Sequence, residues 1–191
     1  MAIDTGLGVT CADLQATGGI KQILLRSWET ADAITYGAGT THTITNIQSG
    51  GDANWFVYEF KNENPSLTIT ATKENGSTAF ECSLSFMIPN IAATRFEELK
   101  NLESTCMMGL VLDTNDKWWA IGVSSKYANE DVAAKSQTFL NLVGFEGGTG
   151  AAYSDENGIT VNLMARQFEL PREYAGTVSV DTSALTATTG A

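Results

Sequence analysis

Histidine and cysteine are scarce in this chain of 191 residues, and each scarcity removes a class of function. The single histidine, His42, excludes a metal site built on two or more imidazoles. No G-x-S-x-G elbow accompanies it, so we expect a surface or capping histidine and no catalytic triad. The three cysteines, Cys11, Cys82 and Cys106, have no C-x-x-C spacing. This excludes zinc ribbons and thioredoxin-type motifs, and we expect three reduced thiols.

Long apolar runs and an excess of basic charge are also missing. No stretch approaches the roughly 18 apolar residues that span a bilayer. The first residues, MAIDTG, lack the basic and apolar parts of a secretory signal, so we expect synthesis in the cytosol and no membrane partner. A net charge of -11 disfavours binding to nucleic-acid phosphates. Nucleic acid can nevertheless pass such a surface without sticking to it.

Motifs that would carry chemistry are incomplete. The stretch GFEGGTG (144–150) lacks the Lys-Ser/Thr of a phosphate-binding loop and is interpreted as a flexible loop. The stretch DTNDK (113–117) lacks the glycine and distal glutamate of a calcium loop, so a polar hairpin turn explains it. We therefore expect no catalytic, cofactor-binding or metal-binding residues. An enzyme that uses paired carboxylates such as Glu97 and Glu98 stays open as an alternative.

What the chain does contain is alternating apolar and polar residues, which predict a mainly β protein. We expect an antiparallel β-barrel or sandwich with long hairpins and one short flanking helix. Strands are expected within 18–28, 42–47, 55–62, 66–72, 80–88, 107–113, 118–124 and 159–170. The helix is expected over 90–105, with Phe96, Leu99 and Leu102 as its apolar stripe. Its start has two candidate caps, a capping box from Thr94 to Glu97, or Asn90.

The central hairpin has two unlike faces. Asn75-Gly76 supplies the positive φ angles that a tight turn needs. One face is apolar and is expected to cover a core; it carries Leu67, Ile69, Ala71, Phe80, Cys82, Leu84, Phe86 and Ile88. The other face is rich in hydroxyl groups, from Ser66, Thr68, Thr70, Thr72, Ser83 and Ser85. A hydroxyl face is unsuited to a dry interior, and we expect it to line a space shared by several copies.

The adjacent tryptophans Trp118 and Trp119 are the candidate interface residues. Neighbouring residues of a strand point to opposite sides, so we expect one ring in the core and the other against solvent or a partner. The sheets also need a way to manage their open edges. Pairing with copies of the same chain around a ring would do so. We divide the chain into an arm (1–17), a β domain (18–170) and a C-terminal extension (171–191) that is loose or bound to a partner.

The order of these elements resembles the tail tube proteins of bacteriophages, whose fold is shared with the hemolysin-coregulated tube protein of type VI secretion. The resemblance covers most of 18–170. It is carried by a strand near the start, a long hairpin ending in Pro89-Asn90 and one short helix. Two more hairpins, GLVLDTNDKWWAIG (109–122) and SDENGITVNLMA (154–165), complete it.

The resemblance implies a virion structural protein without enzymatic activity or cofactor. It implies hexameric rings stacked into a hollow tail tube that conducts the genome without binding it specifically. The six hydroxyl residues would line the bore, which departs from the family pattern by carrying little charge. The sheath, tape measure and baseplate are the implied partners, and 2–17, 125–150 and 171–191 are candidate contacts between rings.

Besides the enzyme, two other functions stay open at this stage. One is another virion role, in a neck or baseplate ring or as a head-decoration protein. The other is a small-ligand-binding β-barrel in which Trp55, Phe56 and Trp118 line a cavity. The barrel predicts a sealed apolar interior and a monomer.

Overall fold

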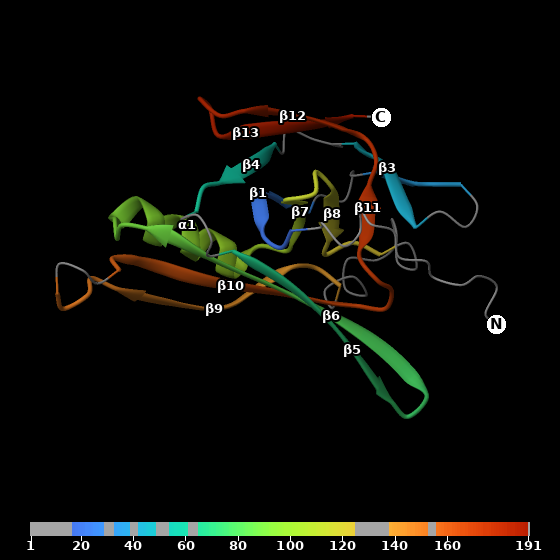
Figure 1. Cartoon of the computed structure of the whole chain (residues 1–191), viewed down its shortest axis with the longest axis horizontal. Coiled ribbons are helices and arrows are strands. Elements are labelled where there is room, and N and C mark those ends of the chain that lie inside the picture. Colours follow the sequence, from blue (N-terminus) through green and yellow to red (C-terminus); the bar gives the residue numbers. More distant parts are fainter. Residues whose placement is uncertain are drawn as a thin grey trace.

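The computed structural model describes residues 17–28, 33–38, 42–48, 54–60, 65–124, 138–152 and 156–190. Within these ranges the chain forms thirteen strands and one helix, arranged as two sheets that pack face to face (Figure 1). The expected mainly β class with one flanking helix is confirmed.

The smaller sheet has four antiparallel strands in the order β5-β6-β10-β9. These strands are β5 (Ser66–Glu74), β6 (Ser77–Pro89), β10 (Gly158–Gln167) and β9 (Asn141–Gly148). The turn between β5 and β6 lies at Asn75 and Gly76, whose φ angles are 49° and 82°. The central hairpin and its turn are therefore as the sequence predicted.

The larger sheet has nine strands in the order β12-β13-β4-β1-β7-β8-β11-β3-β2. Their bounds are β1 (Ile20–Ser27), β2 (Ala33–Tyr36), β3 (Thr43–Gln48), β4 (Trp55–Tyr58), β7 (Met107–Asp113), β8 (Trp118–Ile121), β11 (Arg172–Tyr174), β12 (Thr177–Asp181) and β13 (Thr186–Gly190). The sheet curls until the Thr189 hydroxyl on β13 donates to the Ile47 carbonyl on β3 over 2.7 Å. The described strands nevertheless form no closed barrel, so of the two expected architectures the sandwich is correct.

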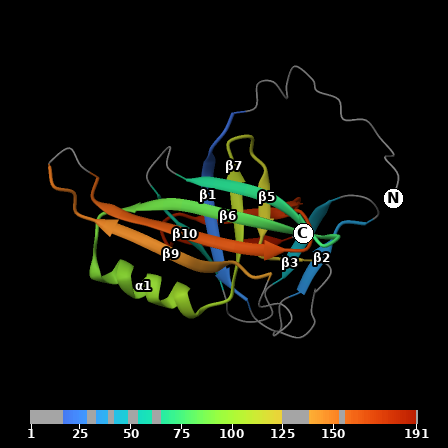
Figure 2. The same ribbon diagram turned by 90° about the horizontal axis from the view of Figure 1, so that it is seen from below.

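Two apolar clusters fill the molecule. Strands of the two sheets cross at a steep angle (Figure 2), and the first cluster lies between them, with Leu84 and Val161 from one sheet and Leu25 from the other. The second cluster lies inside the curl of the nine-stranded sheet and includes Leu24 and Leu110. Because Leu24 and Leu25 point to opposite clusters, β1 is buried on both faces.

The helix α1 (Ala93–Ser104) covers part of the first cluster, but less of its predicted stripe is buried than expected. Leu99 and Leu102 are buried, whereas Phe96 is 44% exposed. The predicted caps are wrong as well, because the helix starts after Ala92 without a side-chain cap hydrogen bond. The helix is instead tied to the larger sheet by the Tyr58 hydroxyl, which donates to the Glu98 carboxylate. It is not long and apolar enough to cross a membrane.

Two segments differ from their predictions because tertiary pairing orders them. The stretch 144–150, expected to be a flexible loop, is largely the strand β9, which β10 supplies with hydrogen-bonding partners. The C-terminal extension is not loose between 172 and 190, where it adds β11, β12 and β13 to the larger sheet. Ala187 is buried there. The arm up to residue 16 and the segment 125–137 lie outside the described residues.

Candidate functional site

The six predicted hydroxyl residues lie together on the outer face of the four-stranded sheet, the face turned to the viewer in Figure 2. Ser66 pairs with Ser85 and Thr68 with Ser83 across the two strands. The hydroxyl residues of β5 are exposed, and Ser83 and Ser85 are half-buried. The opposite face of β6 holds the buried Cys82, Leu84, Phe86 and Ile88. The hydroxyl face is thus a surface of the protomer and not part of its core.

The same polar face extends over β10 and β9, a part that the sequence analysis missed. Across β6, β10 and β9, one row of neighbours is Ser85, Asn162 and Gly144. The next row, in the same strand order, is Ser83, Met164 and Asn141. The signal was present in ITVNLMAR (159–166), where Ile159, Val161, Leu163 and Ala165 are all buried. Every second residue of such a strand must face the other way.

Charge is sparse on the described part of this face. Near the hairpin tip Arg166 and Glu81 form an exposed ion pair of 3.7 Å, which lines a shallow hollow with Thr72 and Ser77. Glu146 on β9 also lies on this face, since its register partner Thr160 faces outward. Exposed ion pairs contribute little stability, so the face is mainly a neutral, hydrogen-bonding surface.

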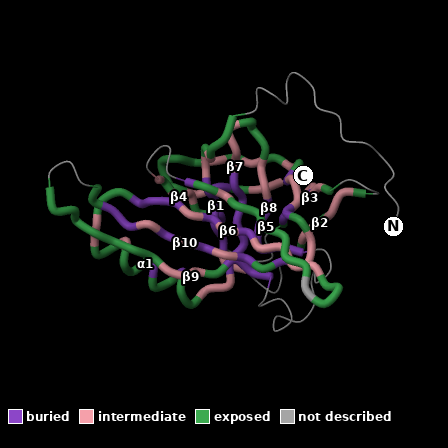
Figure 3. Tube along the Cα trace, turned by 60° about the horizontal axis from the view of Figure 1, so that its bottom comes forward, coloured by how far each residue is buried: buried purple, intermediate pink, exposed green. Residues whose placement is uncertain are grey.

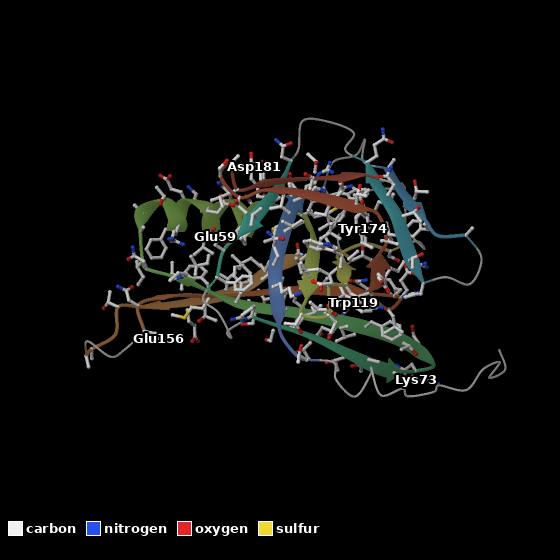
Figure 4. The ribbon with its side chains drawn as sticks, turned by 45° about the horizontal axis from the view of Figure 1, so that its top comes forward. Glu59, Lys73, Trp119, Glu156, Tyr174 and Asp181 are labelled. Carbon is white, nitrogen blue, oxygen red and sulfur yellow. The ribbon has the colours of Figure 1, made fainter. Side chains whose placement is uncertain are left out.

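The apolar row of β5 is more exposed than the sequence predicted. Ile69 is 44% exposed, Leu67 is half-buried, and Ala71 is exposed. The end of the β5–β6 hairpin points away from the larger sheet, with Lys73 near its tip (Figures 1 and 4). The row is apolar because it continues the core face of β6; Leu67 packs at the border of the first cluster, whereas Ile69 and Ala71 stay exposed.

A pocket of about 290 Å³ opens beside this exposed row. Its walls are mostly apolar and include Ile20, Leu67, Ile69 and Val111, with Trp119 at one side. Figure 4 shows Trp119 in the middle of the molecule, close to the hairpin. Of the two candidate interface residues, Trp119 therefore lies at a surface pocket, whereas Trp118 packs against the second cluster. Their opposite directions are as predicted.

Asp113 links Trp119 in the pocket wall to the backbone of the β7–β8 turn through hydrogen bonds. Its carboxylate accepts hydrogen bonds from the Trp119 indole (3.0 Å) and from the backbone N–H groups of Asn115 (2.8 Å) and Lys117 (2.9 Å). Burial opposes ionisation of this carboxyl, but the hydrogen bonds outweigh it and hold the pKa of Asp113 below its usual value. The DTNDK stretch is therefore a hairpin turn, as expected, and the structure adds that its own aspartate organises it.

The two end strands of the smaller sheet are open. Among the described residues, nothing pairs with the outer side of β5 or of β9. Figure 3 shows that exposed residues follow both strands. Few of the devices that usually prevent pairing are present: β5 is uncharged from Ser66 to Thr72, and β9 carries one charge, Glu146, and one bulge, at Val143.

The histidine and the described cysteines lie in surroundings that indicate structural roles. His42 is exposed, and its Nε2 lies 2.9 Å from the Leu170 carbonyl. Cys82 is a buried free thiol, and burial together with the charge of Glu81 raises its pKa to about 12. Cys106 is free and half-buried, while Cys11 lies outside the described residues. The part of the chain that the structure describes holds no group of three or more metal-ligating side chains.

No protein-family model matches the chain, and no curated protein is significantly similar to it. The features that bear on function are therefore those of the fold itself. They are one neutral, polar sheet face and two open strand edges on either side of it.

Proposed function

We propose that this chain is a structural protein of a bacteriophage virion that assembles edge to edge into rings, which stack to form the tail tube. The observation that carries the proposal is the four-stranded sheet with two open edges and a hydroxyl-rich outer face. Copies that continue this sheet around a ring would satisfy the edges. They would also turn the hydroxyl face into the lining of a channel for the genome.

The directions of the strands allow copies related by rotation about a ring axis to pair through their edges. The four strands alternate in direction, so β9 at one edge runs opposite to β5 at the other. When a copy is placed beside the first in the same orientation, its β5 meets β9 as an antiparallel neighbour. The new pair then has the same geometry as the pairs inside each sheet.

The offset between the two edge strands supports closure into a barrel. Strand β5 pairs with residues 77–85 of β6, whereas β9 lies, across β10, level with residues 83–89. The centres of β5 and β9 are thus displaced along the strand direction by about five residues, or about 16 Å. Across the sheet, the step from β5 of one copy to β5 of the next is four strand spacings, which sum to about 19 Å. Such an offset tilts the strands by about 40° from the ring axis, and closed barrels typically have tilts of about 35–45°.

The lining suits passive conduction. Six copies, the number that the resemblance implies, would close a barrel with a bore of roughly 50 Å between backbones, wider than duplex nucleic acid. Hydroxyl groups exchange hydrogen bonds with water and present no fixed cationic site to phosphates. The net charge of -11 disfavours adhesion further.

The test is assembly of the full chain over a wide range of concentration, observed by negative-stain microscopy and sedimentation. We expect rings at intermediate concentration and tubes at high concentration. A protein that stays monomeric throughout refutes the proposal. Rings that never stack would favour the alternative of a neck or baseplate ring.

The small-ligand-binding barrel has less support from the fold. The described strands do not close, and the three residues expected around one cavity do not share one. Trp55 is buried in the second cluster, while Phe56 is 50% exposed.

A further inference from the structure

We propose that neighbouring copies join in one register, in which β9 of one copy pairs with Ser66–Thr72 of the next and Phe145 lies against Ile69. This inference rests on the proposed function, since it concerns the joint from which the ring is built. It identifies the binding surface on each edge and makes the second copy of this chain the partner.

The pleat of the strands restricts the possible registers. Phe145 pairs with the buried Val161 and therefore points to the core side of the sheet. On β5 the core side carries Leu67, Ile69, Ala71 and Lys73, because Leu67 and Ile69 pair with the buried Leu84 and Cys82. A shift by one residue would turn every side chain to the wrong face. The offset of about five residues between the edges must therefore be four or six.

Charge and length favour the offset of four. Because Val143 is the extra residue of a bulge, all of β9 pairs with Ser66–Thr72 in this register, with Gly148 opposite Ser66, Glu146 opposite Thr68 and Phe145 opposite Ile69. The paired stretch of β5 is then its uncharged part, and the charged hairpin tip stays free. An offset of six would place Leu142 beside Lys73 and leave Leu67 unpaired. The offset of four corresponds to a strand tilt of about 35°, still within the range of closed barrels.

The shapes of the two edges also favour this register. Phe145 is 47% exposed at the β9 edge, and Ile69 is 44% exposed at the β5 edge. The pocket of about 290 Å³ lies beside Ile69, on the core side of the sheet, which is the side to which Phe145 points. The neighbour's phenyl ring would therefore enter it between Ile69 and Trp119.

The pocket accepts an apolar ring without leaving a polar group unsatisfied. The only carboxylate in its wall, that of Asp113, already accepts the hydrogen bonds from Trp119, Asn115 and Lys117. Covering such a group costs little, because its water has already been replaced by protein donors.

The occupant is a second copy because the two edges match each other. The strands β5 and β9 run antiparallel and have nearly equal length. The exposed ring of Phe145 is on β9 and the pocket is beside β5, and both lie on the core side of the sheet. In a chain with a net charge of -11, an uncharged edge is where two copies can approach without repulsion. Because the two halves differ, the contact is heterologous and repeats around a ring.

A cysteine pair tests the register. Thr68→Cys and Glu146→Cys are introduced together into the full chain, with Cys11 and Cys106 replaced by serine, and the assembled protein is oxidised. Both positions are exposed, so the monomer should fold normally. Directly opposite residues have Cβ atoms about 4.5–5.5 Å apart, near the reach of a disulfide, whereas diagonal residues are about 7–8 Å apart. We expect a ladder of covalent multimers on a non-reducing gel.

The matched control is Thr70→Cys with Glu146→Cys, which would be opposite only with an offset of six and should give little product. A mixture of the two single variants, Thr68→Cys and Glu146→Cys, should give a covalent dimer and nothing larger. This mixture also tests the joint if the double variant folds poorly.

Each other outcome overturns the inference. Cross-linking of the Thr70 pair alone shows the other register. Wild-type rings without cross-linking of either pair place the joint elsewhere while the proposed function stands. A wild-type protein that is monomeric at all concentrations removes both.

Discussion

The substitution Phe145→Ala isolates the energy of one joint between copies. Phe145 is 47% exposed in the protomer. A fully covered aromatic side chain buries about 150–250 Å², so the neighbour would cover roughly 70–120 Å² of this ring. At about 25 cal/mol per Å² this is about 2–3 kcal/mol per joint, which weakens each joint by about 30- to 150-fold.

The assay is the concentration at which rings appear, measured by sedimentation over a dilution series and checked by negative-stain microscopy. Each copy contributes one Phe145 and one pocket to the ring, so every joint is weakened equally. We expect the threshold for Phe145→Ala to lie at least about tenfold above that of the wild type. Circular dichroism and thermal unfolding establish that the variant protomer is folded.

Phe56→Ala is the matched control. Phe56 is the same residue type and is 50% exposed, but it lies on β4 in the larger sheet. Its replacement should leave the threshold unchanged. The reasoning is refuted if Phe145→Ala assembles at the wild-type threshold, or if both variants raise it equally, which would indicate unspecific apolar association.

Three further predictions concern the protomer. Tyr58→Phe removes the hydrogen bond to Glu98 that ties α1 to β4; it should lower the free energy of unfolding in urea by about 1 kcal/mol and speed amide exchange in α1, and unchanged exchange would contradict this. Asp113→Asn should cost about 1–2 kcal/mol at pH 7. Because folding lowers the pKa of Asp113, the ionised carboxylate contributes its full stabilisation above the pKa of an unfolded aspartate, about 3.9, and this stabilisation is lost as the pH falls through the folded pKa. If the wild type keeps the same stability advantage over Asp113→Asn down to about pH 2, this assignment is refuted. Gly176→Ala would place a Cβ atom 2.4 Å from the Gly190 carbonyl oxygen, so we expect a loss of more than about 2 kcal/mol in thermal unfolding, and a wild-type melting temperature would show that the backbone yields there.

Much of the smaller sheet could be predicted because its signals are local. Asn75-Gly76 between two alternating runs specifies a hairpin, and the structure has that hairpin. β9 was missed because its residues from 144 to 148 are rich in glycine and read locally as a loop. Its order comes from pairing with β10, which no local pattern reveals. The helix caps were mispredicted for the opposite reason, since a local match at Thr94 has no matching hydrogen bond.

For the candidate site, the sequence by itself determined which side chains share a face. The strand period of two residues separates hydroxyl from apolar groups on β5 and β6, whatever surrounds them. Only the tertiary structure decided which of those faces is covered. Ile69 and Cys82 lie opposite each other on the core side of the sheet, yet Cys82 is buried in the first cluster whereas Ile69 borders an open pocket between the two sheets. Burial depends on layers assembled from distant parts of the chain, whereas alternation is a property of each strand alone.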